Sequence, residues 1–460
     1  MEEFNETESH PFYASRASLS AIAAKQREMK LFDPIHQRVK IAQKKILYSP
    51  TDKLYQAYVG LLSGICGIVE INERLRADPV LQRSFGMEGC ADQSVIQETL
   101  SACTEANASE IEEAIDLIYQ AHGRGFRHDY SEAFQILDID LTGQPCGRKA
   151  EFATKGYFAK QRNRRGRQLG RVLATRYQEI VADRLYPGRV QLNSALPDLL
   201  AAAESALKLD AEKRRRTILR IDAGGGTRED INRALTLGYQ IHGKDYSSVR
   251  AEKLAESVVE WVSDPRDSNR QFGRVTTPAT EYVRPVVRIA VRCRSEKDGW
   301  KAGAIVSTLS EAEAIREAGL SEEESRHPQS GLLAYVRFYD RRGGACETEF
   351  KGDKQGLGMT KRNKKRFAAQ RVLTALGALA HNALIWAKAW LLEKAPVLSD
   401  YGIMRIRRDL LAIQGVVEFD SQGSIRRISL NPYSLLARHC FSAFQSLLAP
   451  LSIVVILGQT

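Results

Sequence analysis

The spacing of apolar residues changes at Phe134, and this change constrains the fold more than any other feature of the chain. Between residues 51 and 130, apolar side chains recur every three or four positions, which predicts helices. After Phe134 the period is two, so that Ile136, Asp138 and Asp140 share one face of a predicted strand. A helical segment therefore precedes a domain that contains strands.

Beyond this strand, predicted helices and strands take turns along the chain. The expected elements are helices over 192–209 and 229–237 and strands over 217–222 and 239–244. Such alternation argues for an α/β domain. Residues 258–309 instead predict a mostly β insertion, with a hairpin loop at 295–299. A strand over 332–339 and a long apolar helix over 361–393 then resume the α/β domain.

Composition limits the class of protein. The 460 residues predict two or three domains, or one domain with large insertions. With 43% apolar residues the chain is too apolar to be disordered, and its net charge of +11 favours phosphate-rich partners. The seven cysteines contain no Cys-x-x-Cys pair and support neither a disulfide framework nor a zinc ribbon. Residues 1–10 lack the apolar core of a signal peptide, so we expect a cytoplasmic protein.

Two segments are candidates for contact with nucleic acid by their charge. Residues 147–171 carry nine Lys or Arg residues against one acid, Glu151, which predicts an exposed basic hairpin. The first turns of the 361–393 helix are basic too. One-signed charge at this density repels itself unless an anion neutralises it, so we favour phosphate contacts over a solvated charged face. The candidate DNA-binding residues are Arg162, Arg164, Arg165, Arg167, Lys364 and Lys365.

A pair of short helices near residue 100 has two interpretations. Ala91 to Ser94 form a start signal for one helix, and residues 105–109 cap the next. Two short helices across a tight turn could form a helix-turn-helix, and a plain helical bundle explains the pattern equally well.

Three acids are notable for their positions. Asp140 and Asp222 lie near the ends of apolar strands, where a charge must be paired, hydrogen-bonded or bound to a metal ion. Taken alone, each is explained as well by a cap or an ion pair as by catalysis. Glu347 precedes Lys354 by seven residues, almost two helical turns, so both would share one helix face.

These residues belong to a longer motif. Tyr339-x-x-Arg342, then Glu347, then Lys354 resembles the Tyr-Arg-Glu-Lys signature of the DDE transposases of bacterial insertion sequences. The family usually has three residues between Arg and Glu, whereas four separate Arg342 from Glu347 here, which leaves Arg341 as a substitute.

Two further blocks resemble the same family. Residues 137–142, with 151–157 after them, are similar to the block of the first aspartate, and residues 219–226 to that of the second. The resemblance extends from about residue 85 to about residue 394, with the blocks in the family's order.

The resemblance implies a ribonuclease H-like core, interrupted by a β insertion before the helix that carries the glutamate. It implies that Asp140, Asp222 and Glu347 are catalytic and hold two Mg²⁺ ions, for which Mn²⁺ can substitute, since Mg²⁺ prefers oxygen ligands. Two such ions activate a water or a 3′-hydroxyl and stabilise the leaving oxygen of a phosphodiester. The residues implied as phosphate ligands are Tyr339, Arg342 and Lys354.

As a whole, the resemblance predicts a Mg²⁺-dependent transposase that cuts and joins DNA at the terminal inverted repeats of an insertion sequence. Its implied partners are double-stranded DNA and a second copy in a synaptic complex, with no membrane, at the nucleoid of a bacterium. A non-catalytic DNA-binding protein, such as a decayed transposase kept as a regulator, is the alternative. The presence of all three acids speaks against decay.

On this interpretation the chain divides into five parts. They are a helical N-terminal domain for binding DNA ends (1–131), the first part of the core (132–250), the mostly β insertion (251–330), the second part of the core (331–398) and a C-terminal segment that is a candidate for dimerisation (399–460).

Two choices within the site depend on detail. Asp138 shares the strand face of Asp140, and we prefer Asp140 because it precedes Thr142 by two, as the family's first aspartate usually precedes a Thr. Family members commonly hold a flipped base in the insertion, and Trp300 is the candidate for stacking on it. Packing across strands is the favoured alternative for Trp300, and Trp261, in an apolar helical run, is expected in the core.

Overall fold

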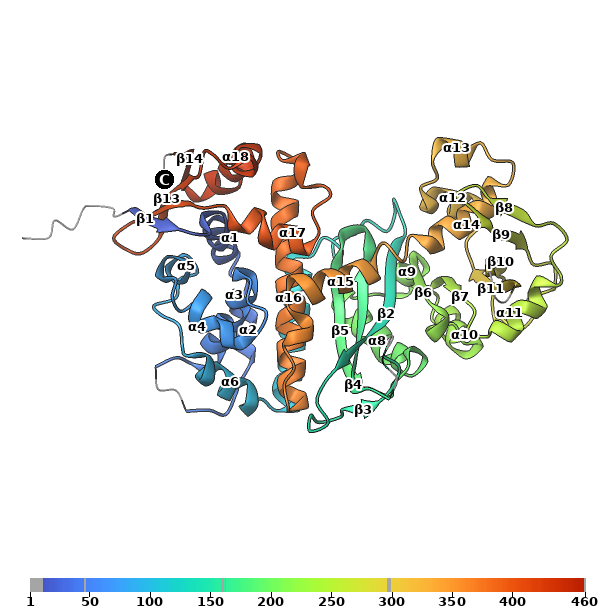
Figure 1. Ribbon diagram of the computed structural model, residues 1–460, viewed down its shortest axis with the longest axis horizontal. Helices are drawn as coiled ribbons and strands as arrows, with labels where there is room; N and C mark the ends of the chain where they lie inside the picture. The colour runs from blue at the N-terminus through green and yellow to red at the C-terminus, as the bar shows by residue number, and fades with distance from the viewer. Residues whose placement is uncertain (1–10, 45–46, 159–160, 162, 296–298, 459–460) are drawn as a thin grey trace, which may run out of the picture. The chain divides into compact units, whose positions relative to one another are not determined.

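The computed structural model describes all residues except 1–10, 45–46, 159–160, 162, 296–298 and 459–460 (Figure 1). The chain forms two compact units. The helical unit comprises residues 1–123, 146–151 and 349–460, and the sheet unit comprises 124–145 and 152–348. The five-part division expected from the sequence stays a prediction beside these two units.

Over the residues that the structure describes, the sheet unit is built on one mixed sheet of ten strands. Its strands are β2 (Gln135–Pro145), β3 (Thr154–Lys155), β4 (Arg165–Ala174), β5 (Glu179–Pro187), β6 (Thr217–Ile221), β7 (Gln240–Lys244), β8 (Val262–Asp264), β9 (Asp267–Arg274), β10 (Val287–Ser295) and β11 (Gly299–Ser307). Their order is β3-β4-β2-β6-β7-β11-β10-β9-β8, and β5 also pairs with β4.

Strand direction changes along this sheet. β4 is antiparallel to both β5 and β2, whereas β2, β6 and β7 run parallel to one another. β11 then pairs antiparallel with β7, so the strands of the 258–309 segment continue the same sheet. The predicted mixed α/β fold is confirmed.

Helices cover the sheet. The helices of this unit are α8 (Leu192–Leu207), α9 (Ala211–Arg215), α10 (Arg228–Thr236), α11 (Ser248–Ala255), α12 (Glu311–Ala318), α13 (Glu322–Ser325) and α14 (Ser330–Asp340), with short 3₁₀ turns at Thr175–Tyr177 and Ala223–Gly225. The buried face of α11 packs against Ala290 and Ala304, whereas α14 packs on the opposite face, where Ile289 and Ile305 point.

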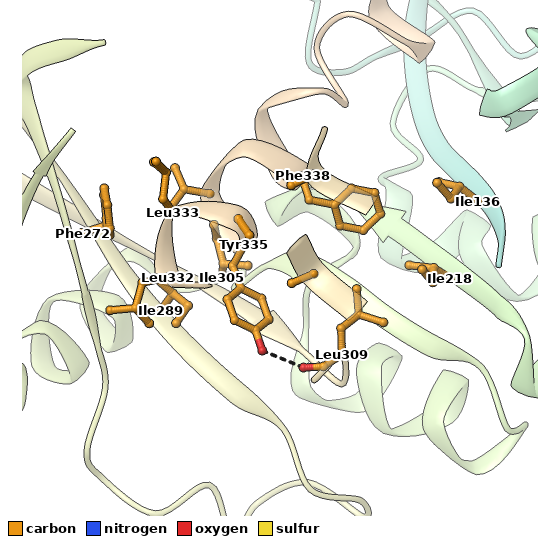
Figure 2. Close-up of a cluster of buried hydrophobic side chains, with 14 of the residues drawn as sticks. Ile136, Ile218, Phe272, Ile289, Ile305, Leu309, Leu332, Leu333, Tyr335 and Phe338 are labelled. Atoms are coloured by element: carbon orange, nitrogen blue, oxygen red, sulfur yellow. Dashed lines mark hydrogen bonds between the residues drawn. The ribbon is translucent and has the colours of Figure 1, made fainter. Parts of the chain in front are cut away.

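One hydrophobic core lies beneath α14. Figure 2 shows its side chains, and Tyr335 of α14 donates a hydrogen bond from its hydroxyl to the carbonyl of Leu309 at 2.8 Å. The core gathers residues from β2 and β6, from the insertion strands and from α14, including Ile136, Ile218, Phe272, Ile289, Ile305, Leu333 and Phe338. The insertion and the first strands are therefore packed beneath the same helix.

The expectation of a strand over 332–339 is wrong, because this segment is helix α14. All residues from Gly331 to Phe338 are buried. A helix that is buried almost all round lacks the apolar stripe by which a surface helix is recognised, and its short apolar run then resembles a buried strand.

The helical unit contains most of the remaining elements. Its helices are α1 (Ala17–Glu28), α2 (Asp33–Arg38), α3 (Pro50–Ser63), α4 (Ile71–Arg74), α5 (Pro79–Ser84), α6 (Gln93–Ala102), α7 (Glu105–His122), α16 (Phe367–Leu392), α17 (Ile403–Arg408) and α18 (Leu435–Leu448). A small sheet has the strand order β1 (Pro11–Ala14), β12 (Gly415–Phe419), β13 (Ile425–Leu430) and β14 (Val454–Leu457). Helix α15 (Cys346–Gly356) begins in the sheet unit and ends in the helical unit.

The helix starts in this unit differ in part from expectation. Asp92 caps α6 as predicted, accepting the Ser94 N–H at 2.9 Å, whereas Thr104 caps α7. The helix expected over 361–393 begins only at Phe367, whose N–H donates to the Glu151 carboxylate at 2.7 Å. The basic residues expected in its first turns therefore precede it.

Helix α16 has the length and composition of a membrane span. An 18-residue window of this 26-residue helix reaches a mean hydropathy of 1.2, and 94% of that window is buried within the protein. Such burial is typical of a core helix.

Candidate active site

The register of two parallel strands brings two aspartates together. Ile139 of β2 pairs with Ile221 of β6, and each is followed at once by an aspartate, Asp140 and Asp222. Asp222 begins the 3₁₀ turn after β6, and its carboxylate accepts the N–H of Gly224 at 2.9 Å. The two carboxylates thus start from equivalent positions on neighbouring strands.

Glycine is required in the loop that follows Asp222. A side chain on Gly226 would place its Cβ 1.9 Å from the carbonyl oxygen of Lys244, at the end of β7. The backbone of Gly226 in turn accepts the N–H of Tyr246 at 3.1 Å. The backbone after β6 is thus in close contact with the backbone at the end of β7.

Asp138 and Asp140 share a strand face but differ in their partners. Arg220 donates two hydrogen bonds to Asp138, at 2.6 and 2.7 Å, and Thr175 donates a third at 2.8 Å. Asp138 is fully buried in this arrangement. The carboxylate of Asp140 accepts the N–H of Leu141 at 2.8 Å and faces the guanidinium of Arg342.

Arg220 is a residue that sequence reasoning missed. It lies two residues before Asp222, just as Asp138 lies two residues before Asp140. A charged residue in the middle of the apolar strand β6, opposite a strand with two aspartates, is the signal that could have revealed the pair. Arg220 also donates to the carbonyl of Phe338, which ties α14 to the sheet.

Arg342 lies in the turn after α14 and contacts the carboxylates of both Asp140 and Glu347. Its Nη2 is 3.2 Å from Oδ2 of Asp140 and donates to the carbonyl of Ile139 at 3.3 Å. Its Nη1 is 3.7 Å from Oε1 of Glu347. Arg341 is exposed and donates to the carbonyl of Glu317 at 3.0 Å instead. Of the two arginines, Arg342 is therefore the one near the acids.

The electrostatics of the three acids are coupled. Burial raises the pKa of Asp140 to about 6, with Asp222 and Glu347 adding to the rise and Arg342 opposing it. Burial also raises the pKa of Tyr339 to about 12, so its hydroxyl keeps its proton. Burial opposes the charge of Arg342, yet Asp140 and Asp222 outweigh it and raise its pKa above the ordinary value.

Glu347 and Lys354 both lie on α15, as their spacing predicts. Glu347 is in the first turn, with its side chain 62% exposed, and Lys354, half-buried, is seven residues further on. Tyr339 is the penultimate residue of α14. The sheet unit thus brings Asp140, Asp222, Glu347, Tyr339 and Arg342 into one electrostatic group.

The family described as Transposase DDE domain group 1 matches residues 13–449. The chain belongs to this family of DDE transposases. Among solved structures, the cryo-EM structure of the piggyBac transposase synaptic complex with hairpin DNA is similar, with a TM-score of 0.45 and 12% identity, over 88% of this chain and 82% of that chain. No curated protein matches the sequence.

The donors of the transposase site suit a hard divalent cation. Asp140, Asp222 and Glu347 offer only carboxylate oxygens, which is the ligand type of Mg²⁺. Burial raises the pKa of Asp140, with the charges of Asp222 and Glu347 adding to the rise, and a bound cation would offset both causes. Among the described residues, however, no three His, Cys, Asp or Glu side chains lie together as a ready metal site.

The basic hairpin of the transposase is only partly exposed. Arg164 is exposed, and Arg165 is half-buried and donates to the carbonyl of Ala153 at 3.2 Å, whereas Arg162 lies outside the described residues. The expectation of exposure is wrong for Arg167, which is buried. It lies on β4, an inner strand between β2 and β5, where it pairs with Gln144 and Pro187.

The second basic cluster lies in the helical unit. Lys365 is exposed, whereas Lys364 is half-buried and its ammonium donates to the side-chain carbonyl of Gln97. Burial, with the charge of Arg362 adding to it, lowers the pKa of Lys364 to about 8. Of the two lysines, Lys365 is the better placed for solvent and ligands.

Trp300 is 39% exposed and contacts a cation. The guanidinium of Arg292 lies 4.7 Å from the ring centre of Trp300 and 3.9 Å from that of Trp261. The expectation of a helix at Trp261 is wrong, because α11 ends at Ala255, whereas the half-buried ring of Trp261 does pack against the core formed by α11, Ala290 and Ala304. Both rings thus stack on one arginine of the insertion sheet.

An open cavity of about 460 Å³ lies beside Tyr339. Its charged lining residues are Lys244, Asp267, Arg270, Lys301 and Asp340, and the small residues 302–304 of β11 also line it. Since residues alternate along a strand, Trp300 and Lys301 point to opposite faces of β11. The cavity and the Trp300 stack are therefore separate features.

Proposed function

We propose that this transposase cuts and joins phosphodiester bonds at the terminal inverted repeats of a bacterial insertion sequence, on a ribonuclease H-like core. The observation that carries the proposal is the juxtaposition of Asp140, in the middle of β2, and Asp222, directly after β6, with Arg342 reaching Asp140 and Glu347. The core assignment is supported by the strand order β5-β4-β2-β6-β7, in which antiparallel pairs precede parallel ones.

In this proposal Asp140, Asp222 and Glu347 hold two Mg²⁺ ions, or Mn²⁺ in their place. When bound, such ions activate a water or a 3′-hydroxyl and stabilise the leaving oxygen. Asp140 is ionised at pH values above its pKa of about 6 and is then able to act as a ligand. Tyr339 keeps its proton and donates a hydrogen bond to a phosphate oxygen.

The remaining polar residues bind the DNA. Arg342 offers a planar fork to a phosphate, and Lys354 a point charge. Arg164, Arg165, Lys364 and Lys365 supply further phosphate contacts. The contact of Trp300 with Arg292 supports a packing role over base stacking. The active form is a homodimer on two transposon ends.

The test is cleavage of DNA that carries the terminal sequences flanking the gene, with purified protein and Mg²⁺. The wild type should nick or cut at the element boundary. Asp140→Ala, Asp222→Ala and Glu347→Ala should each abolish cleavage and leave DNA binding nearly intact, because the basic residues remain. Specific binding by the wild type without any strand cleavage would support the regulator instead.

A further inference from the structure

Arg342 occupies the position between two acids that the proposed function assigns to metal ions. It is 4% exposed, with Nη2 at 3.2 Å from Asp140 and Nη1 at 3.7 Å from Glu347. Its Nε is buried and has no hydrogen-bond partner among the described residues. The guanidinium is therefore held by these carboxylates and one backbone carbonyl, and retains an unused donor.

A guanidinium in this place competes with a divalent cation. Arg342 and a metal ion would both need Oδ2 of Asp140, and two cations at one carboxylate repel each other. Burial strengthens the competition, since the Asp140 side chain is only 14% exposed and has little access to water as a substitute partner. Removal of the guanidinium without a replacement would leave the acids to repel one another.

The competition also involves DNA. The planar fork of arginine suits a phosphate as well as a carboxylate, and the unused Nε adds a donor on the same plane. A backbone phosphate that arrives at the site would draw Arg342 away from Asp140 and free the carboxylate. The site would then gain a negative neighbour and lose a positive one, and both changes favour a bound divalent cation.

We propose that Arg342 is an internal counter-ion that keeps the acids of the site paired until DNA arrives, so that divalent cations bind tightly only to the DNA complex. The inference rests on the proposed function. By linkage, DNA raises the affinity for the cation by the same factor as the cation raises the affinity for DNA. The device would restrain metal-dependent cleavage by the free protein.

The test is Mn²⁺ binding by the full-length protein, followed by electron paramagnetic resonance of free Mn²⁺. Without DNA, Arg342→Ala should bind Mn²⁺ on the order of tenfold more tightly than the wild type. Arg341→Ala is the matched control, since it removes an adjacent arginine that donates to the Glu317 carbonyl, and it should match the wild type. Equal affinities for the wild type and Arg342→Ala would overturn the proposal.

A second measurement begins with the wild type, and that part of it does not depend on the folding of a variant. A duplex with the terminal sequence flanking the gene should raise the Mn²⁺ affinity of the wild type by a similar factor. The same duplex should leave Arg342→Ala nearly unchanged. If DNA does not change the Mn²⁺ affinity of the wild type, the counter-ion role of Arg342 is contradicted and the proposed function is not. Mn²⁺ affinity that is unaffected by Asp140→Asn and Asp222→Asn would instead remove the carboxylates as ligands and overturn the proposed function.

Discussion

Arg220 and Asp138 form a buried, two-pronged ion pair across neighbouring parallel strands, with Nε 2.6 Å from Oδ1 and Nη2 2.7 Å from Oδ2. Two residues further along the chain from each lie Asp222, directly after β6, and Asp140, within β2. Asp138 and Arg220 therefore neutralise each other across the two strands, whereas Asp140 and Asp222 are two acids side by side. The first and second aspartates of β2 should consequently respond to substitution in different ways.

Asp138→Asn should lower the free energy of unfolding by about 3–5 kcal/mol, because it leaves the Arg220 charge buried without its partner. Asp140→Asn should keep the fold and lose DNA cleavage. Urea unfolding and a cleavage assay on both variants separate the two effects. A stable Asp138→Asn protein without activity, beside an active Asp140→Asn protein, would show that Asp138 is the first ligand.

His242 should make the sheet unit sensitive to acid. Burial, with Arg220 adding to it, lowers the pKa of His242 to about 3, and the ring lies between Ser307 and the Tyr335 carbonyl. In the unfolded chain His242 is therefore protonated below about pH 6.5, whereas in the folded chain it is protonated only below about pH 3. Stability is full above pH 6.5 and falls as the pH drops, by about 2 kcal/mol at pH 5.

His242→Gln removes this proton and keeps a polar group at the same place. The expected result is a smaller loss of unfolding free energy between pH 7 and pH 5 than in the wild type, measured by urea titration at each pH. The same pH dependence in both proteins would assign the acid sensitivity to other groups.

Arg337 should contribute strongly to the free energy of unfolding of the sheet unit. It donates to both oxygens of Asp264, at 2.5 and 2.8 Å, and to Glu324 at 2.5 Å, and all three residues are buried. Arg337→Ala should cost about 3–5 kcal/mol of unfolding free energy, because two buried carboxylates lose their shared cation. Thermal or urea unfolding measures the loss.

The control for Arg337 lies on the surface nearby. Arg326 pairs with Glu322 at 3.2 Å, with side chains 79% and 89% exposed, so Arg326→Ala should cost below about 1 kcal/mol. Similar losses in both variants would mean that burial does not decide the strength of these pairs.

DNA binding should depend on salt through the exposed basic residues. Arg164→Ala, at an exposed position, should reduce the slope of log affinity against log salt by roughly 0.9 if it removes one phosphate contact. The slope is measured by fluorescence anisotropy over a salt series, with Arg326→Ala as the charge-matched control. An unchanged slope in Arg164→Ala would mean that Arg164 contacts no phosphate and lies on an ordinary solvated surface.

The pairing of the two aspartates could be predicted from the sequence, because each follows an apolar run; the expected strand end holds for Asp222, whereas β2 continues past Asp140 to Pro145. Parallel pairing then places the two acids side by side. The partner of Asp138 could not be predicted in this way, because Arg220 is 82 positions away and only the register selects it.

Burial was harder to predict than secondary structure. Arg167 belongs to a run of arginines, and nothing local distinguishes it from Arg164. The difference arises because β4 continues inward between two partner strands, whereas Arg164 precedes the strand. The apolar run of helix α14 resembles a strand for a related reason, since burial on nearly all sides removes the periodicity by which helices are recognised.

The pairing of β11 with β7 also matters for solubility. Without it, β7 would expose a row of unpaired N–H and C=O groups, which are a template for aggregation between molecules. The extended sheet instead ends at β8, which is only three residues long, with a register shift between Ser263 and Asp264 and its aspartate fixed by Arg337. The strands of residues 258–309 therefore cover the edge of β7 and leave a short, irregular edge strand in its place. Such an edge offers less backbone for pairing with a strand of another molecule.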